Sequence, residues 1–391
     1  MRVAFFQRMF ASYQLGLVKE LAAHSSHVYE FFGDRADPLH SGIRVIPQEI
    51  CQKLPFTYCR TKHYGAHLAF QWRAVREALS GRFDVFVFEG SLTMPTNWMA
   101  LLSAKVRGKR VYFYTHGWTS ADGIFKRVLR RGLFGPADGL LLYGWRARRI
   151  GEKAGYPPRR LHVVYNCLDD EEIRRQVESL TEARCREFRR EWFGQDADNP
   201  VIASVGRLAH GKRFSLLVDA AAVLLRQGLH VNLLLVGDGP ERESLAEQAK
   251  EAGVRLAFAG AQYDESFLSL ALASADLAVI PGAAGLSVIH SLSYGTPVVV
   301  HGNDAVQMPE TEAVEDGLNG AIFREGDVGD LARSISRILR ELPRGPIRAT
   351  RCRRVIEAKY SPARMREAFD RAISGDAAPD SPQPDEEVLR A

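Results

Sequence analysis

Two cationic side chains lie five residues apart where an apolar run gives way to a helical pattern. Arg207 and Lys212 follow the run at 201–206, VIASVG, and precede the helix expected at 214–226. The first turn of a helix carries backbone N–H groups that have no partner within the helix, and its dipole favours anions. Two cations beside such a turn are suited to clamp a diphosphate. We therefore interpret this turn as a phosphate site.

The segment 278–300, AVIPGAAGLSVIHSLSYGTPVVV, has the same organisation. It predicts a buried strand at 277–280, a Pro-Gly-rich turn, a short helix opening near Gly285, and a second strand at 297–300. The free N–H groups of that helix would point outward at the carboxyl end of a sheet and favour a phosphate. A plain loop between two strands would have nearly the same composition.

The first half of the chain places polar residues at the expected ends of strands. His116 follows the apolar run VYFY, Glu89 ends the run DVFVF, and Gly16 opens the helix expected after the first strand. Ligands of open α/β sheets bind outside the carboxyl ends of the strands, which makes these three residues site candidates. The alternatives are that His116 holds a loop carbonyl and that Gly16 is an ordinary turn glycine.

Residues 124–134, IFKRVLRRGLF, predict an amphipathic helix with one apolar and one basic face. Such a helix can lie on an anionic membrane surface, or it can be an ordinary helix that covers a sheet. Arg146, Arg148 and Arg149 add basic character nearby. Residues 1–170 contain 25 Lys and Arg against 13 Asp and Glu, whereas the remainder contains 27 against 34, so the first half favours an anionic partner. No nucleic-acid-binding module is recognisable, and we expect no nucleic-acid partner.

Composition indicates a globular protein of two domains. The chain has 391 residues, of which 46% are hydrophobic and 25% charged, and no apolar run approaches the length of a membrane span. The N-terminus reads as a first strand and not as a signal peptide. Its five cysteines form no C-x-x-C pair, which argues against disulfides and zinc and fits a reducing cytoplasm.

Apolar runs alternate with helical patterns through both halves of the chain, which predicts two doubly wound α/β domains. We expect domains at 1–169 and 200–343, a charged helical linker at 170–199, crossover helices at 344–374 and a disordered tail at 375–391. Asp196 and Asp198 form a D-x-D sequence, but they precede a strand instead of following one, so we expect no metal there.

The second half resembles the retaining GT-B glycosyltransferases of family 4, which transfer sugars from nucleotide-sugars. The motifs, in order, are S-V-G-R-L-x-x-x-K at 204–212, L-V-G-D-G-P at 235–240, F-x-G at 258–260, A-D-L-x-V-x-P at 275–281, G-L at 285–286, Y-G-T-P-V-V at 294–299 and D-G-L-N-G at 316–320. The first half matches in outline only, with N-C-L-D at 166–169. The resemblance implies the GT-B fold, in which two Rossmann-like domains face each other across a cleft.

The resemblance also implies roles for individual residues. Arg207 and Lys212 would clamp the donor diphosphate, and the backbone of Gly285 and Leu286 would hold its distal phosphate. His116 would lie near the donor sugar. The remaining donor-site residues would be glycines that let the nucleotide-sugar approach the backbone: Gly16, Gly206, Gly237 and Gly260.

The chain departs from the family at two glutamates, of which the first faces the donor sugar and the second binds the ribose. Counted back from 294–297, those positions are Gly282 and His290. A neutral His290 can still hydrogen-bond a ribose hydroxyl. Glu310 and Glu312, just beyond the next strand, are candidates to replace a lost carboxylate.

The function implied is a metal-independent hexosyltransferase that moves a sugar, most often from a UDP-sugar, to a hydroxyl with retention of configuration. The nucleotide-sugar is a co-substrate, and no cofactor is expected. The expected acceptor is a glycan or a lipid-linked glycan of a bacterial cell surface, met in the cytoplasm or at the inner face of the membrane. The alternatives are glycosylation of a soluble natural product, an epimerase or hydrolase of the same fold, and a catalytically silent nucleotide-sugar-binding protein.

Overall fold

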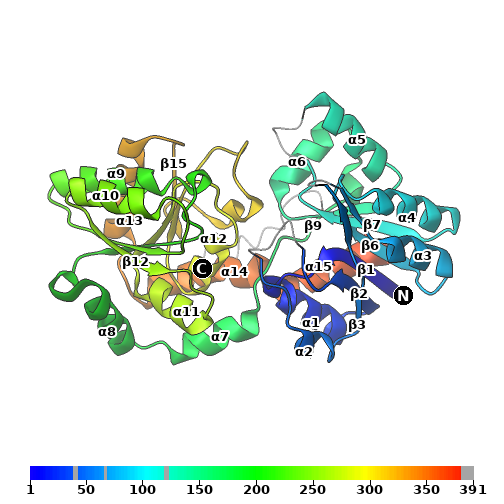
Figure 1. Ribbon diagram of the computed structural model, residues 1–391, viewed down its shortest axis with the longest axis horizontal. Coiled ribbons are helices and arrows are strands. Elements are labelled where there is room, and N and C mark those ends of the chain that lie inside the picture. The colour runs from blue at the N-terminus through cyan, green and yellow to red at the C-terminus, as the bar shows by residue number, and fades with distance from the viewer. Residues whose placement is uncertain (38–42, 66–67, 119–122, 380–391) are drawn as a thin grey trace. The chain divides into compact units, whose positions relative to one another are not determined.

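The structure is a computed structural model, which describes residues 1–37, 43–65, 68–118 and 123–379. The chain forms two compact units (Figure 1). Unit 1 comprises Met1–Asp169 and Lys359–Ala391, and unit 2 comprises Asp170–Ala358. Most of the predicted tail, 380–391, lies outside the described residues.

Unit 1 is built on a seven-stranded parallel sheet in the order β3-β2-β1-β6-β7-β8-β9. Its strands are β1 Arg2–Met9, β2 Val28–Asp34, β3 Phe56–Tyr58, β6 Val85–Glu89, β7 Arg110–Thr115, β8 Gly139–Leu142 and β9 Leu161–Val163. Its helices are α1 Leu15–His24, α2 Gln48–Cys51, α3 Trp72–Ser80, α4 Pro95–Val106, α5 Ile124–Phe134, α6 Trp145–Lys153 and α15 Pro362–Ser374.

Successive residues of β1 point to opposite faces of the sheet and supply two separate cores. Val3 and Phe5 pack with α1 and α15, whereas Ala4 and Phe6 pack with α3, α4 and α5. Both faces are therefore covered by helices, which is why the strands are almost wholly apolar and buried.

Unit 2 has a six-stranded sheet in the order β12-β11-β10-β13-β14-β15, again with every pairing parallel. Its strands are β10 Val201–Val205, β11 Asn232–Val236, β12 Arg255–Gly260, β13 Leu277–Ile280, β14 Val298–His301 and β15 Gly320–Phe323. Its helices are α7 Asp170–Ser179, α8 Glu182–Phe193, α9 Phe214–Arg226, α10 Arg242–Glu251, α11 Glu265–Ser274, α12 Ser287–Ser293, α13 Val328–Glu341 and α14 Pro346–Lys359.

The fold class predicted from the sequence is confirmed, because both sheets are doubly wound and Rossmann-like. The charged segment at 170–199 forms α7 and α8, and α8 contributes Phe188 and Phe193 to a core of unit 2. Three short strands of unit 1 were not predicted: β3, and the antiparallel pair β4 Lys62–Tyr64 and β5 Leu68–Phe70. No helix in the described ranges is both long and apolar enough to cross a bilayer.

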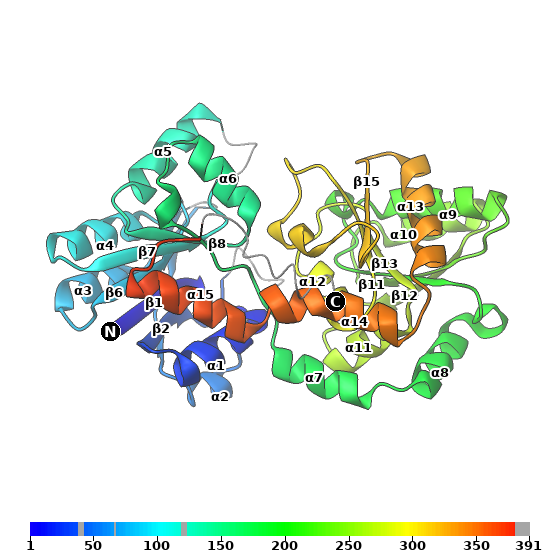
Figure 2. The same ribbon diagram turned by 180° about the vertical axis from the view of Figure 1, so that it is seen from behind.

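The last helix that the structure describes, α15, completes the core of the first unit (Figure 2). Phe369 of α15 is fully buried, with ring centroids 5.8 Å from Phe5 and 5.7 Å from Tyr114. The Tyr112 hydroxyl donates to the carbonyl oxygen of Ala372 at 2.7 Å. The side chain of Asp370 accepts from the hydroxyl of Ser25 at 2.5 Å, which fixes α15 against the end of α1.

Replacing Phe369 by Ala should lower the free energy of unfolding by about 3–5 kcal/mol, because the change leaves a cavity between α15 and the sheet. Urea unfolding followed by circular dichroism measures it. Arg364→Ala on the same helix is the control, since Arg364 is 54% exposed and makes only a surface ion pair with Glu367. A loss below 1 kcal/mol for Phe369→Ala would contradict the inclusion of α15 in unit 1.

Candidate functional site

The predicted donor residues of unit 2 lie at the point in its sheet where the connections between strands reverse their direction across the sheet. β10 runs on to β11 on one side, and its other neighbour is β13. Such a switch point leaves a crevice outside the carboxyl ends of the two strands. Gly206 and Arg207 follow β10, and Gly282 follows β13, so both predicted loops begin at this crevice.

The two predicted cations differ in their surroundings. Arg207 is exposed, and the structure gives its guanidinium no hydrogen bond or ion pair with any described residue. Lys212 is half-buried, and its Nζ donates to the carbonyl oxygen of Ala283 at 2.6 Å. Burial lowers the pKa of Lys212, and the negative charge of Glu310 acts in the opposite direction. One cation is therefore available to a ligand, and the other is tied to the loop after β13.

The loop after β13 lies so close to the turn of Lys212 that no side chain fits at position 282. A Cβ on Gly282 would lie 2.3 Å from the carbonyl oxygen of Gly211 and 2.7 Å from the carbonyl carbon of Lys212. Gln307 holds the loop from the other side. Its Oε1 accepts from Ala284 N at 2.9 Å, and its Nε2 donates to Gly282 O at 3.3 Å. A glutamate at 282 is thus incompatible with this backbone.

His290 is bound to a carboxylate that the sequence analysis missed. Its Nε2 lies 2.6 Å from Oε1 of Glu265, and the hydroxyl of Tyr294 donates to the same oxygen at 2.5 Å. Glu265 is the first residue of α11, whereas His290 and Tyr294 belong to α12 and its end. The pair is separated by 25 residues and joined only by tertiary packing, so no motif signalled it.

The surroundings of Glu265 stabilise its charged form. Burial by itself would raise the pKa of Glu265, but the hydrogen bond and charge of His290, followed by the hydrogen bond of Tyr294, lower it overall. Burial and the negative charge of Glu265 raise the pKa of Tyr294, which keeps the phenol protonated as a donor. His290 lies at the position where the family has its second glutamate, and the carboxylate of Glu265 contacts its imidazole.

Four more residues of unit 2 were predicted as possible parts of the donor site. Glu310 and Glu312 lie in the short helix Pro309–Ala313, where Glu310 is buried near Lys212 and Glu312 is half-buried. Gly285 and Leu286 directly precede α12, as expected.

The glycines at three strand ends permit close contacts of the backbone. A Cβ on Gly237 would lie 1.8 Å from the carbonyl oxygen of Gly206. Gly260 has φ of 70° and forms an isolated bridge with Gly237. Packing accounts for Gly237 and the positive φ accounts for Gly260 without a ligand, and the donor-binding role of Gly206, Gly237 and Gly260 stays a prediction.

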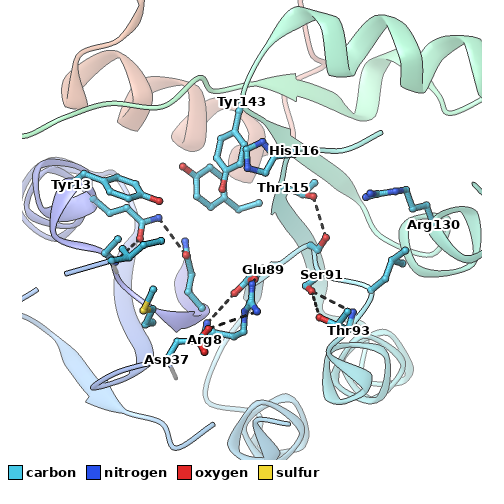
Figure 3. Close-up of a pocket in the computed structure, with 18 of the residues that line it drawn as sticks. Arg8, Tyr13, Asp37, Glu89, Ser91, Thr93, Thr115, His116, Arg130 and Tyr143 are labelled. Atoms are coloured by element: carbon cyan, nitrogen blue, oxygen red, sulfur yellow. Dashed lines mark hydrogen bonds and ion pairs between the residues drawn. The ribbon is translucent and has the colours of Figure 1, made fainter. Parts of the chain in front are cut away.

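Unit 1 has a pocket of about 490 Å³ at its own switch point, between the carboxyl ends of β1 and β6 (Figure 3). Most of its lining groups can form hydrogen bonds: they include Gln7, Arg8, Gln14, Glu89, Ser91, Thr93, Thr115, His116, Lys126, Arg130 and Tyr143. A small, hydroxyl-rich molecule suits such a lining.

Arg8 and Glu89 form the charged floor of this pocket. The Glu89 carboxylate accepts from Arg8 Nε at 2.8 Å and from Arg8 N at 3.0 Å. Asp37, whose side chain is 2% exposed, lies 3.8 Å from Arg8 and 3.5 Å from His63. Sequence reasoning found Glu89 but missed Arg8, because Arg8 lies inside the first strand.

His116 faces the same pocket and contacts Tyr143 edge-on, with ring centroids 4.4 Å apart. His116 is exposed where it lines the pocket. Desolvation by the protein around the ring, followed by the charge of Arg130, lowers the pKa of His116 to about 4. At neutral pH the ring is therefore uncharged and can both donate and accept a hydrogen bond.

Gly16 lies in α1 rather than in a loop, and a Cβ there would come within 2.9 Å of Leu168 O and of Pro362. Chain packing explains this glycine, and its phosphate-facing role stays a prediction.

The expectation that Arg146 and Arg148 add basic surface is wrong, because they are 9% and 1% exposed and Arg148 pairs with Glu152 at 2.8 Å.

Among the residues that the structure describes, no three His, Cys, Asp or Glu side chains gather as a metal ligand set.

The space at Gly282 is too small for any side chain. Gly282→Ala should lower the free energy of unfolding by about 1–3 kcal/mol, because the added methyl group must displace the turn of Lys212. Gly211→Ala is the matched control on the opposing turn, since a Cβ there meets nothing within 4 Å. Urea unfolding of both variants gives the comparison, and equal stabilities would contradict the contact.

The contribution of Glu265 to stability depends on pH, because its carboxylate is held in the charged form. Glu265→Gln should lower stability at pH 7 by about 1–2 kcal/mol, because bonds to a charged acceptor become bonds to a neutral one. The folded-state pKa of Glu265 is below the ordinary 4.5, so its contribution is complete above 4.5 and is lost as pH falls through the folded value. The difference from wild type should therefore shrink in acid.

Thermal unfolding from pH 7 to pH 3 measures the effect, with the exposed Glu247→Gln as control. A difference that grows in acid would show that Glu265 is not held ionised.

Two family models match successive parts of the chain. Residues 11–172 match Glycosyltransferase Family 4, and residues 186–360 match Glycosyl transferases group 1. In three dimensions the chain is similar to Anabaena Alr3699/HepE solved in complex with UDP, with a TM-score of 0.73 and 16% identity over 96% of this chain and all of that one.

Curated relatives match over shorter stretches. The alpha-D-kanosaminyltransferase of Streptomyces kanamyceticus is 28% identical over 226 residues, which are 56% of this chain and 55% of that protein. The lipopolysaccharide core biosynthesis glycosyltransferase LpsE of Rhizobium meliloti is 36% identical over 148 residues, or 37% of this chain and 40% of that protein. The chain thus spans about half the length of the first of these relatives and less than half of the second. With its family 4 and group 1 domains in tandem on two Rossmann-like sheets, it belongs to the GT-B glycosyltransferases of family 4/group 1.

Proposed function

We propose that the protein transfers a sugar from a nucleotide-sugar, with retention of configuration, to a hydroxyl group of an acceptor. The observation that carries the proposal is the guanidinium of Arg207, which pairs with no residue that the structure describes, near Lys212 at the switch point of unit 2. Tandem domains of glycosyltransferase families support the same reaction.

The chain's own charges would assist departure of the nucleoside diphosphate. Arg207 binds the diphosphate, and Lys212 adds positive charge while it positions the loop at 282–286. The N–H groups near Gly285 and Leu286 contact the distal phosphate. As the bond from sugar to phosphate breaks, negative charge collects on the leaving oxygen, and these groups stabilise it more than they stabilise the substrate. This arrangement requires no divalent metal.

The acceptor hydroxyl attacks the same face of the sugar from which the diphosphate leaves. A new bond forms between the acceptor oxygen and the anomeric carbon, and the proton of the hydroxyl passes to the leaving phosphate. No side-chain nucleophile is needed. We place the acceptor in the pocket of unit 1, where the uncharged His116 can hydrogen-bond a hydroxyl, and we keep His116 as a contact of the reacting sugars.

We infer the chemical classes of donor and acceptor from proteins that are similar to this chain. A UDP-sugar is the donor we favour, because HepE was solved with UDP. LpsE supports a glycan or lipid-linked acceptor of the cell surface, and the kanosaminyltransferase supports a soluble natural product as the second candidate. The epimerase or hydrolase alternative would show as product formation from the nucleotide-sugar without any acceptor.

Thermal stabilisation by nucleotides tests the donor site. We expect UDP, or else GDP or dTDP, to raise the melting temperature of the protein without added metal, since a ligand that binds only the folded state stabilises it. No shift with any of the three, or with their sugar derivatives, would favour the catalytically silent alternative, in which Gly282 and His290 mark a lost site.

Replacing Arg207 by Ala should lower kcat by about 100-fold to 1,000-fold, the usual loss when one preorganised charge-stabilising group is removed. Release of the nucleoside diphosphate in the presence of acceptor measures turnover. Arg226→Ala, at the exposed end of α9, is the matched control in the same unit. Near-normal turnover by Arg207→Ala would overturn the clamp.

A further inference from the structure

The hairpin formed by β4 and β5 carries apolar side chains on the face that points away from the protein. In its register Lys62 pairs with Phe70, His63 with Ala69, and Tyr64 with Leu68. Because side chains alternate across a strand, the middle pair shares one face and the outer two pairs share the other. Ala69 is 1% exposed, which identifies the middle pair as inward, whereas Tyr64 is 58% and Leu68 42% exposed.

Three aromatic rings continue along this outward face into the first turn of α3. The ring centroids of Tyr64 and Phe70 are 5.3 Å apart, and those of Phe70 and Trp72 are 6.1 Å apart. Trp72 is 52% exposed. A hairpin face that meets only water is normally polar, so a continuous apolar row there indicates an interaction surface.

The charged residues within the segment that carries this row have one sign. Residues 60–76 contain four Lys and Arg and no Asp or Glu. Arg60 and Lys62 are exposed, and the side chain of Arg76 is 72% exposed. The next acid, Glu77, is only 4% exposed and is held by Arg82 and Arg73. The surface therefore offers positive charge around an apolar centre.

We propose that the outward face of the hairpin, together with Trp72, docks on an anionic lipid membrane. Trp and Tyr favour the boundary between water and hydrocarbon, because each has an apolar ring and a polar tip. Leu68 and Phe70 add apolar surface to bury, and Arg60, Lys62 and Arg76 are attracted to anionic headgroups. This surface replaces the basic cluster expected around Arg146 and Arg148, which are buried.

The hairpin also adjoins the pocket of unit 1. His63 lies 3.5 Å from Asp37, and the backbone N–H of Ala69 donates to Thr93 O at 3.0 Å; Asp37 and Thr93 both line the pocket. If the pocket holds the acceptor, as the proposed function states, docking here would bring a lipid-linked acceptor to it. Docking itself does not depend on sugar transfer.

Cosedimentation of the full chain with vesicles tests the proposal. We expect binding to phosphatidylcholine vesicles that contain phosphatidylglycerol, little binding to phosphatidylcholine alone, and release at high salt. Leu68→Ser/Trp72→Ser should weaken binding by on the order of tenfold or more, since both side chains lose their apolar burial. Leu102→Ser/Val106→Ser is the matched control, because both are exposed apolar residues of α4, 59% and 89%.

A second pair of variants separates this face from α5. Arg60→Gln/Lys62→Gln should weaken binding by on the order of tenfold, whereas Lys126→Gln/Arg131→Gln, which removes equal charge from exposed positions of α5, should not. The reverse pattern, or unchanged binding by Leu68→Ser/Trp72→Ser, overturns the proposal. So does a higher KM of that variant for a soluble glycan without any loss of vesicle binding.

Melting temperatures equal to that of wild type establish that the variants fold. Nucleotide-induced stabilisation reports on the transferase site separately, so failure of either idea can be recognised on its own.

Discussion

The reversal of connection direction in each parallel sheet is the constraint on which the rest of this protein depends. Parallel strands are connected by crossovers that run along one face of the sheet. Where successive crossovers change from one face to the other, the loops that follow the two adjacent strands diverge and leave a crevice at their carboxyl ends. In unit 2 this happens between β10 and β13, and in unit 1 between β1 and β6. The two loops of unit 2 then meet only because Gly282 has no side chain, and their contact fixes Lys212 on the carbonyl of Ala283.

The same contact excludes a carboxylate from position 282, where the family has its first glutamate. A carboxylate at 282 would have to enter space that the Lys212 turn occupies. Negative charge instead comes from two other segments: Glu310 lies buried near Lys212, and Glu265 binds His290 from a different helix. Two acids from outside the motif therefore lie beside its residues, Glu265 at His290 and Glu310 at Lys212.

Residues close in sequence were predicted well, and partners joined by tertiary packing were not. The helix Phe214–Arg226 and the strand Leu277–Ile280 have the predicted bounds, because a buried apolar run between turn residues has few other solutions. β3, β4 and β5 were missed, since three residues are too few to show a period. Arg148 looked like a surface cation but is covered, and Glu265 gave no signal, since its partner is set by how α11 packs on α12.

The placement of α15 has a consequence for synthesis. Ribosomes release the chain from its N-terminus, and domains generally fold in that order. Here residues 170–358 form a unit of their own before the helix that covers one face of the first sheet has been made. Phe5 and Tyr114 obtain their contacts with Phe369 only when the chain has grown 367 residues beyond Arg2, where the first strand begins. The second unit of the nascent protein is thus synthesised in full before the first is complete, and the part of the sheet face that α15 covers is open to chaperones in the interval.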